Sequence, residues 1–550
     1  MLSNQISQLI TEAIKKAQKK GDLPKFDIPE VLIERPKDSS HGDYATPVAL
    51  GLARYARMAP VQIAEKIVAR AAAVDFVGEL TVAHPGFINI RLATDWLVQQ
   101  VDTVLAEGDQ YGQLKLSDKK VQVEYISANP TGPLTVGSGR NAVLGDTLAN
   151  VLAAAGYTVQ REFYVNDVGT QVDNMGKALY VRYQQALGLE VAEPDEYQGQ
   201  YLRDMGQRLA QAEGEKYLHT NQNEALAFMR QHALENIVAG IKEDAALIGI
   251  HFDQWFSEQS LYDKGIYGQV FNKLSSQGLT IERDGAIWLK SDDDNDKDNV
   301  IVRSDGRPTY FASDIAYAWN KLAMRKFDWA IYVWGADHHG HIKRVKKVVD
   351  MLGLDSNRVT MLLYQLVTIT REGVPVRQSK RTGEFITTRE VVEEIGADAF
   401  RFMLLTRSAD SQMELDLTLA TKQSNENPVY YVQYGHARIA SIFRKAEEEG
   451  ASMAGGEVTL LTHPSELELI RQMLRLREVI ADIVETLGSH QLTYYAQELA
   501  SAFHAFYRDC KVVMPEEPAL TAARLKLVKA AQITLANTLR LMGMSAPDRM

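Results

Sequence analysis

The chain has 550 residues but only one cysteine, Cys510. A single cysteine cannot form a disulfide within the chain, and it cannot supply the thiolate cluster of a structural zinc site. Proteins of reducing compartments rarely carry disulfides, whereas small secreted proteins often depend on them. We therefore expect a protein of the cytoplasm.

Long apolar runs are also missing. No stretch approaches the roughly 18 consecutive apolar residues of a transmembrane helix, and the first residues, Met1 to Ile6, lack the basic and then apolar pattern of a signal peptide. The hydrophobic content of 45% and the charged content of 24% are ordinary for a globular protein. A chain of this length exceeds the size of one core, so we expect roughly two to four domains and no membrane association.

Basic residues are outnumbered, because the formal net charge is −11 at pH 7. Proteins that coat nucleic acids bind phosphates with an excess of lysine and arginine, and this composition excludes that class. Any contact with a nucleic acid must therefore be local. Two basic clusters are candidates for such contacts, one at residues 341–347 and one at residues 377–381.

The first part of the chain, residues 1–110, has the pattern of a small α+β domain. Apolar residues recur at helical spacing between positions 9 and 17, and the lysines and Gly21 that follow are typical of a helix end. Residues 87–92 alternate between apolar and polar side chains, as in a strand. The acidic, glycine-containing stretch at 107–112 is interpreted as a linker.

The second part, residues 118–390, has the order of a parallel α/β sheet. Residues 121–126 and 158–165 are rich in β-forming side chains. Between them, residues 141–155 carry an apolar stripe at helical spacing. This order predicts one βαβ unit of a Rossmann-like sheet.

The remainder of the chain extends this pattern. A charged, glutamine-rich stretch around 173–246 has helical character and is interpreted as an insertion. Strand patterns resume at 299–302 and 329–334, so we expect a sheet built from two halves of the sequence. Residues 391–550 are nearly all helical in pattern. The expected fold is a multidomain α/β protein, with a Rossmann-like parallel-sheet domain between an N-terminal α+β domain and a C-terminal all-α bundle.

A glycine-rich loop at residues 129–140 follows the first strand of the βαβ unit. Gly137-Ser-Gly-Arg-Asn-Ala142 satisfies the dinucleotide fingerprint, and Glu162 lies where an acid for the ribose is expected, so an NAD-dependent oxidoreductase is one alternative. Against it, a long loop stiffened by Pro130 and Pro133 separates the strand from the glycines. Small residues before a helix still allow a ligand close to amides that attract anions, which predicts a phosphate site.

A second loop, Val376-Arg-Gln-Ser-Lys-Arg-Thr-Gly383, gathers three cations within five residues. Such a loop can close over a polyphosphate and neutralise the charge that develops when a phosphoryl bond breaks. Alone, it would be interpreted as a basic surface turn. Together the two loops predict a nucleotide site divided between distant segments.

Thr135-Val-Gly-Ser138 stands at the place of the "HIGH" signature of class I aminoacyl-tRNA synthetases, and Arg377-Gln-Ser-Lys-Arg381 at that of "KMSKR". Along nearly its whole length the chain resembles the arginyl-tRNA synthetases in particular. The other stretches that resemble this family, in its order, are Arg35–Thr46, Phe163–Gly169, Trp334–His341, Tyr430–Arg438 and Ser545–Met550.

The resemblance implies an arginine–tRNA ligase. Such an enzyme joins arginine and ATP to form arginyl-adenylate and pyrophosphate, and then passes the arginyl group to tRNA(Arg). The resemblance also implies a cytoplasmic monomer that uses ATP with Mg²⁺, has no tightly bound cofactor, and needs tRNA for the first step. This chemistry requires positioning and charge stabilisation at the α-phosphate rather than a protein nucleophile.

The matching motifs imply a pocket for arginine. Its residues are Glu124, Asn129, Tyr310, Asp314 and His338. A carboxylate such as Asp314 can hold a planar guanidinium through two hydrogen bonds while Tyr310 packs beside it. Asn129 suits the α-amino group of the substrate.

The same resemblance implies a site for ATP. The residues implied to bind ATP are Gly137, Gly335, Asp337, Ser379 and Lys380, and the residues implied to act in catalysis are Thr135, Ser138, Arg377 and Lys380. Glycine permits close approach of the nucleotide, and aspartate accepts hydrogen bonds from ribose hydroxyls. No metal site is expected, because His338, His339 and His341 have no cysteine or third-ligand arrangement beside them.

The first signature departs from its family, because Thr135 and Ser138 replace both histidines. Hydroxyls can donate hydrogen bonds to phosphate oxygens, but they cannot carry the positive charge of an imidazolium. In the second signature, Arg377 replaces a lysine and keeps its charge, and Lys380 is retained. A non-catalytic tRNA-binding relative is therefore an alternative, although the retained charged residues favour an active enzyme.

The helical region resembles the anticodon-binding bundle of the family. Tyr430, Tyr434 and Arg438 combine aromatic faces with a cation, a combination that suits unpaired bases, and the resemblance implies that they bind tRNA. The N-terminal domain resembles the family's module that contacts the tRNA elbow.

Overall fold

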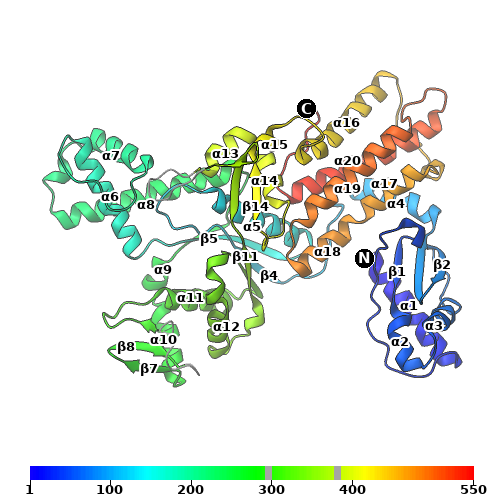
Figure 1. Cartoon of the computed structure of the whole chain (residues 1–550), viewed down its shortest axis with the longest axis horizontal. Coiled ribbons are helices and arrows are strands. Elements are labelled where there is room, and N and C mark those ends of the chain that lie inside the picture. Colours follow the sequence, from blue (N-terminus) through cyan, green and yellow to red (C-terminus); the bar gives the residue numbers. More distant parts are fainter. Residues whose placement is uncertain (291–299, 377–385) are drawn as a thin grey trace.

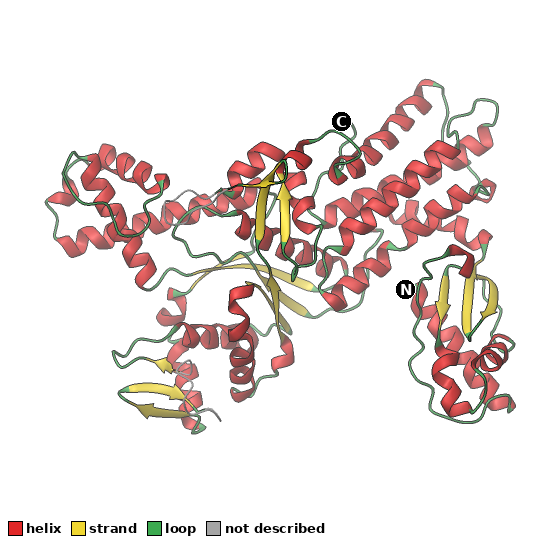
Figure 2. Ribbon diagram, viewed as in Figure 1, coloured by secondary structure: helices red, strands yellow, loops and turns green. Residues whose placement is uncertain are grey.

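The structure is a computed structural model that describes residues 1–290, 300–376 and 386–550. An N-terminal unit and a long helical insertion lie at opposite ends of the molecule, with a parallel sheet and a helical bundle between them (Figure 1). Helices make up most of the molecule, and the strands are confined to a few separate sheets (Figure 2). Among the described residues, none of the helices combines the length and the apolar character that crossing a membrane requires.

The N-terminal unit is an α+β structure, as expected. Its elements are α1 (Leu2–Lys20), β1 (Tyr44–Thr46), α2 (Val48–Ala56), α3 (Pro60–Val68), β2 (Val77–Ala83), β3 (Phe87–Leu92) and α4 (Thr94–Glu107). The apolar positions that predicted α1, from Leu9 to Ala17, are buried, and Gly21 ends the helix with a φ of +80°. The strands form an antiparallel sheet of order β1–β3–β2, in which β3 coincides with the predicted strand.

The central sheet is entirely parallel and has the order β11–β10–β4–β5–β6. Its strands are β4 (Lys120–Glu124), β5 (Thr158–Val165), β6 (Gln254–Ser257), β10 (Trp329–Gly335) and β11 (Val359–Tyr364). Helix α5 (Val136–Ala154) connects β4 to β5, so the predicted βαβ unit is confirmed. The expected Rossmann-like sheet, built from two halves of the sequence, is present.

The segment between β5 and β6 is the helical insertion that the sequence predicts. It contains α6 (Thr170–Ala186), α7 (Gln200–Glu213) and α8 (Gln222–Leu247). Helix α6 packs against both α7 and α8, and the three project away from the sheet (Figure 1).

A further region lies between β6 and β11 and corrects one expectation. Its elements are α9 (Gln259–Asp263), α10 (Ile266–Ser276), β7 (Thr280–Arg283), β8 (Ala286–Leu289), β9 (Val300–Val302), α11 (Tyr310–Trp319) and α12 (Ile342–Met351). The prediction that residues 299–302 join the central sheet is wrong, because β9 pairs antiparallel with β8 in a separate sheet of order β7–β8–β9. A short apolar run indicates a strand but not the strand with which it pairs. Strand β7 of the separate sheet is largely exposed, so its sequence lacks the alternation of a half-buried strand.

A third small sheet, of order β13–β12–β14, follows the central one. This part of the chain contains β12 (Val367–Arg371), β13 (Val374–Pro375), α13 (Thr388–Ile395), α14 (Ala397–Leu405), β14 (Met413–Asp416) and α15 (Leu417–Thr421). Strand β14 pairs parallel with β12 and interrupts the region that was expected to be nearly all helical. The C-terminal bundle is helical, as predicted. It contains α16 (Pro428–Glu448), α17 (Pro464–Leu474), α18 (Leu476–Thr486), α19 (Gln491–Asp509) and α20 (Pro518–Leu541).

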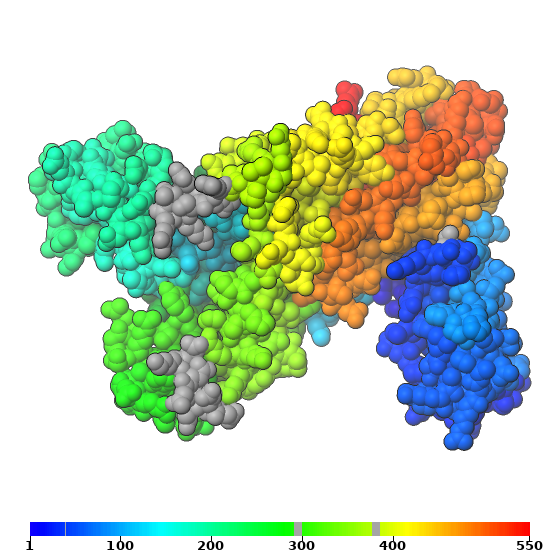
Figure 3. All heavy atoms as spheres, in the orientation of Figure 1, coloured from blue at the N-terminus to red at the C-terminus, as the bar shows by residue number. Residues whose placement is uncertain are grey.

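The N-terminal unit is attached to the bundle through α4, which packs on α17 and α20. The stretch at 107–112 connects the two regions but is not a free linker. Tyr111 is buried and its hydroxyl donates a hydrogen bond to the Met473 carbonyl at 3.0 Å, while Asn537 donates to the carbonyls of Gly108 and Tyr111. The N-terminal unit and the region of α9 to α12 project to the same side of the molecule (Figure 3).

The regions meet at one buried side chain, Arg401 of α14. Its guanidinium forms an ion pair with Asp146 of α5 at 2.5 Å and donates to the carbonyls of Met542 at 2.6 Å and Ile248 at 2.9 Å. Gly543 follows with a φ of +68°, and a Cβ there would lie 2.2 Å from Nη2 of Arg401. The end of the insertion, the central helix and the end of the bundle are therefore held by one cation.

Replacing Arg401 by Met should lower the free energy of unfolding by about 3–5 kcal/mol, because the buried Asp146 would lose its nearest cation and keep only Arg161, at 3.6 Å. Urea unfolding followed by tryptophan fluorescence measures the change. The exposed neighbour Arg407, replaced by Met, is the matched control. Equal stability of the two variants would contradict this assignment.

Candidate active site

The sheet topology indicates where a ligand binds. From β4 the chain proceeds in one direction to β5 and β6, whereas β10 lies on the other side of β4 and leads to β11. Ligands of open α/β sheets bind outside the carboxyl ends of the strands, at the point where the strand order reverses. In this protein that point lies between β4, which ends at Glu124, and β10, which ends at Gly335.

The first signature forms the beginning of α5. Thr135 is the N-cap: its backbone is extended, and its Oγ1 accepts a hydrogen bond from the Ser138 amide at 3.3 Å. The hydroxyls of Thr135 and Ser138 lie 3.3 Å apart, and Gly137 between them leaves the first turn open. Free amides at a helix start attract anions, so this turn offers a phosphate two hydroxyls and several N–H donors.

The second signature lies outside the described residues, including Arg377, Ser379 and Lys380. The chain is described again from residue 386, and it continues directly beside the first signature. Thr387 forms an antiparallel bridge with Thr135. Thr388 donates from its amide to the Leu134 carbonyl and from its hydroxyl to the Thr135 carbonyl, each at 2.8 Å.

Arg140 strengthens this junction, and the sequence analysis did not single it out. Its buried guanidinium donates to three carbonyls, those of Gln365 at 2.7 Å and of Ser411 and Ser408 at 2.9 Å. Desolvation lowers the pKa of Arg140 to about 10. These carbonyls lie just before β12 and β14, so Arg140 fixes α5 to the small sheet that precedes the second signature. A basic residue in the first turns of a helix with an apolar stripe was the signal that could have revealed it.

The end of β10 forms another part of the site. Gly335 is the last residue of the strand, and a Cβ there would lie 2.4 Å from Oδ1 of Asp337. Asp337 and His338 are exposed, and the His338 ring lies 5.6 Å from Trp334. Asn141 fixes this edge to α5, because its side chain donates to the Val333 carbonyl at 2.8 Å.

The carboxyl groups of Asp314 on α11, Glu124 and Glu258 form an acidic cluster, called the acidic pocket below, in which the charges act on one another. Burial and the nearby carboxylates Glu124 and Glu258 together raise the pKa of Asp314 to about 7, against the opposing effect of Lys321 and Arg344. Burial also raises the pKa of Glu258, against the effect of its hydrogen bonds. A site in which carboxylates suppress one another's ionisation favours the arrival of a cation.

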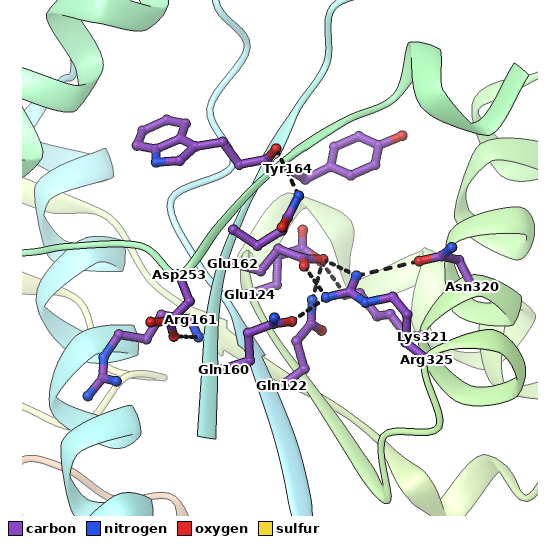
Figure 4. A network of polar contacts seen from close by, with 12 residues as sticks. Gln122, Glu124, Gln160, Arg161, Glu162, Tyr164, Asp253, Asn320, Lys321 and Arg325 are labelled. Atoms are coloured by element: carbon purple, nitrogen blue, oxygen red, sulfur yellow. Dashed lines mark hydrogen bonds and ion pairs between the residues drawn. The ribbon is translucent and has the colours of Figure 1, made fainter. Parts of the chain in front are cut away.

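Glu124, the last residue of β4, is a second member of this cluster. It is nearly fully buried and forms an ion pair with Nζ of Lys321 at 2.5 Å (Figure 4). Asn129, after the strand, is exposed and lies 3.3 Å from the side chain of Asn166. Glu124 and Asn129, which were predicted from one motif, thus differ in burial: Glu124 lies in the interior and Asn129 at the surface.

Tyr310 begins α11 and is 54% exposed. It lines a hollow of about 400 Å³ together with Glu258, Tyr262, Arg230 and Arg303. The hollow lies between the start of the helical insertion and the start of α11. Because Glu258 belongs to its lining, this hollow adjoins the acidic pocket.

The predicted tRNA-binding residues lie on a separate surface, along α16. The rings of Tyr430 and Tyr434 are stacked with centroids 5.6 Å apart and an interplanar angle of 9°. Arg438 lies 4.6 Å above the Tyr434 ring and 5.0 Å from the ring of Tyr507 on α19, which sequence reasoning missed. Beside them is a hollow of about 710 Å³, whose cationic lining is Arg438, Arg444, Lys445, Arg508, Lys511 and Arg549.

Glu162, the acid required by the dinucleotide fingerprint, is fully buried, forms an ion pair with Arg325, and cannot meet a ribose. The alternative of an NAD-dependent oxidoreductase is therefore not supported. In the described part of the chain, no group of three or more His, Cys, Asp or Glu side chains has an arrangement that could hold a metal ion.

Three protein-family models match the chain. They are the arginyl tRNA synthetase N terminal domain at residues 4–92, the class I (R) tRNA synthetase catalytic domain at 100–416, and the DALR anticodon binding domain at 432–550. The chain is 47% identical over 100% of its length to an arginine–tRNA ligase of Dehalococcoides mccartyi, 99% of which is covered. It is 44% identical to that of a Geobacter species, with full coverage of both chains.

Solved structures show the same fold. The arginyl-tRNA synthetase of Thermus thermophilus aligns with a TM-score of 0.78 at 22% identity, covering 100% of both chains. That of Plasmodium falciparum aligns with a TM-score of 0.77 at 17% identity, covering 100% of this chain and 99% of the other.

The cap of α5 gives a test of the first signature. Thr135→Ala removes the oxygen that accepts from the Ser138 amide, and should lower the free energy of unfolding by about 1 kcal/mol. Thr135→Ser keeps that oxygen and is the control, with little loss expected. Thermal unfolding measures both variants. If alanine and serine are equally stable, the capping hydrogen bond does not stabilise the helix.

Proposed function

The chain belongs to the arginyl-tRNA synthetase family, and on that premise we propose that it is an arginine–tRNA ligase. The carboxylate of arginine attacks the α-phosphate of ATP, which forms arginyl-adenylate and releases pyrophosphate. A hydroxyl of the terminal ribose of tRNA(Arg) then attacks the arginyl carbonyl, and AMP leaves. Both steps transfer a group between bound substrates, so the protein must chiefly position them and stabilise charge.

The bridge between Thr135 and Thr387 is the observation that carries the proposal. Lys380 stands seven residues before Thr387. Seven residues span at most about 25 Å, so the second signature starts from an anchor beside the first. Two loops that bind one triphosphate must start from neighbouring points in the structure. Arg140 holds the segments before β12 and β14 beside α5 and so keeps these points together.

We assign the phosphates of ATP to the two signatures. Thr135, Gly137 and Ser138 supply hydroxyls and amides at the start of α5, while Arg377, Ser379 and Lys380 supply positive charge and a hydroxyl. The two hydroxyls replace the histidines of the first signature as donors only. The positive charge at the α-phosphate and at the leaving pyrophosphate must therefore come from the second signature.

We assign the adenosine of ATP to the end of β10. The narrow turn at Gly335 lets the nucleoside approach the backbone, and the exposed carboxylate of Asp337 can accept hydrogen bonds from ribose hydroxyls. His338, beside Trp334, is assigned to the rim that this site shares with the amino acid.

We assign the guanidinium of arginine to Asp314, with Tyr310 beside it and Glu124 at the bottom of the pocket. Asn129 at the rim is placed for the α-amino group. The excess of carboxylates supports this assignment, because the pKa of Asp314 is raised to about 7 until a cation compensates its neighbours.

Mg²⁺ is proposed to enter the site together with ATP. The described residues provide no ligand cluster for it, so we assign it to the phosphates of ATP, which commonly carry this ion into an enzyme. No step is assigned to it.

We propose that tRNA(Arg) binds the stacked surface of α16, where Tyr430, Tyr434 and Arg438 present two aromatic faces and a cation. Unpaired bases stack on such surfaces, and the basic hollow beside them suits the backbone phosphates. We further propose that residues 1–110 contact tRNA, that residues 118–390 catalyse the reaction, and that residues 391–550 bind the anticodon. The protein is proposed to act as a cytoplasmic monomer.

The comparisons do not support a non-catalytic relative, and charging tests this directly. The purified protein with arginine, ATP and tRNA(Arg) should form arginyl-tRNA, as measured by incorporation of labelled arginine. Lys380→Met should lower kcat roughly 100- to 1000-fold, because charge stabilisation at the phosphates is lost. Lys115→Met, at an exposed position far from the signatures, is the control. Binding of tRNA without charging at high protein concentration would instead favour the non-catalytic alternative.

The pKa of Asp314 predicts how the affinity for arginine depends on pH. Arginine binds the ionised carboxylate, so KM for arginine should rise about tenfold per unit as the pH falls below 7, and should level off above it. Charging assays between pH 6 and 8.5 measure this profile.

Asp314→Asn should raise KM roughly 10- to 100-fold at pH 8 and abolish the rise in acid. The exposed Asp305→Asn is the control and should keep the normal profile. An unchanged profile in Asp314→Asn would remove Asp314 from the pocket.

A further inference from the structure

A buried ion network surrounds Glu124 and Glu162 (Figure 4). Its origin is the register of the sheet, which places Glu124 of β4 directly beside Glu162 of β5. Two carboxylates at neighbouring positions in a buried sheet repel each other. Two cations compensate these charges: Lys321 forms an ion pair with Glu124, and Arg325 forms one with Glu162.

Both cations come from an unusual turn. Helix α11 continues into a π-helical turn, Asn320–Met324, in which the Arg325 amide donates to the Asn320 carbonyl at 2.9 Å. Such turns insert one residue into a helix and are frequent at functional sites. The turn carries Lys321 and Arg325 on the side that faces the two glutamates.

Lys321 is the deeper of the two cations. Its side chain is 0% exposed, and its ammonium lies 3.9 Å from the centroid of the Tyr317 ring and 3.5 Å from that of Tyr332. Tyr332 is the partner of Glu124 on the other neighbouring strand, β10. Burial lowers the pKa of Lys321 to about 8, so the ammonium is retained at neutral pH.

The charges around the pocket do not balance. Glu124 is matched by Lys321 and Glu162 by Arg325. Asp314 and Glu258 are the further carboxyl groups of the pocket, and the charge of Glu258 also raises the pKa of Asp314. The pocket therefore prefers a bound cation, and the preference is set by how many of its carboxylates are already matched.

We infer that Lys321 is a positioning residue that sets the charge of the arginine pocket, an inference that rests on the proposed function. By pairing with Glu124 from below, it keeps that carboxylate ionised and fixed as a hydrogen-bond acceptor at the bottom of the pocket. The arriving guanidinium then has to ionise one group, Asp314. Without Lys321, the guanidinium would have to ionise Glu124 as well, because an isolated buried carboxyl group binds a proton.

Proton release on binding measures this directly. Arginine is titrated into the full-length protein at pH 7 by calorimetry, in buffers that differ in their heat of ionisation, which yields the number of protons released. Lys321→Met should release about one proton more than the unaltered protein, and should bind arginine more weakly at pH 6.5 than at pH 8.5 by a larger factor. Citrulline, a neutral analogue, should not cause this release.

Two matched variants isolate the role of the ion pair. Lys273→Met removes another ammonium that lies over an aromatic ring, Trp319, but without a buried carboxylate partner, and should release the normal number of protons. The double variant Glu124→Gln/Lys321→Met removes both charges and should also return to the normal number. The differences therefore report on the charge of Glu124 and on the effect that Glu124 and Lys321 have on Asp314.

Each outcome distinguishes the inference from the function beneath it. If the unaltered protein does not bind arginine, the proposed function fails. If it binds arginine and Lys321→Met releases the same number of protons, Lys321 only fills space and the inference is overturned.

If Lys321→Met does not fold, as judged by its melting curve, a second pair of variants is decisive. Glu124→Gln leaves the ammonium of Lys321 unmatched and should weaken arginine binding. Adding Lys321→Met to Glu124→Gln should strengthen arginine binding at least tenfold relative to Glu124→Gln alone. Equal binding by the single and double variants would overturn the inference.

Discussion

Most of helix α5 is buried on every side, and the rest of the structure is arranged around that constraint. Every residue from Gly139 to Ala149 is buried, so the charged and amide side chains of this stretch need partners within the protein. The partners come from different regions: Arg140 holds the loops before β12 and β14, and Asp146 pairs with Arg401. The insertion, the small sheet and the bundle are thereby all attached to α5, and the first signature forms the N-terminal turn of this helix.

The central sheet imposes a second constraint through its register. Parallel pairing sets Glu124 beside Glu162, and a sheet covered on both faces cannot expose either side chain to water. The π-helical turn resolves the conflict by supplying two cations from one short segment. The same arrangement leaves Asp314 close to the carboxylates of Glu124 and Glu258, and these carboxylates are the basis of the arginine pocket that we propose.

Much of the fold could be predicted from local patterns. The apolar spacing of residues 9–17 and the β-forming run at 158–165 identified α1 and β5, because each element is decided by side chains that are near in sequence. The partner of β9 could not be predicted, because strand pairing is a long-range choice that a short apolar run does not encode. The site showed the same limit: Arg140 and Lys321 bear no motif, and their roles depend on carbonyls and carboxylates hundreds of residues away in sequence.

The sequence by itself determined the family and the order of the regions, and it predicted which residue types could bind phosphate, ribose and a guanidinium. These properties reside in residue types at short spacing, and they hold for any arrangement in space. Only the tertiary structure decided that Glu162 is an interior charge and no ribose ligand, that the chain after the second signature is bridged to Thr135, and that Glu124 is already matched by a cation. Charge and hydrogen bonding act over a few ångströms, and only folding determines which distant residues come that close.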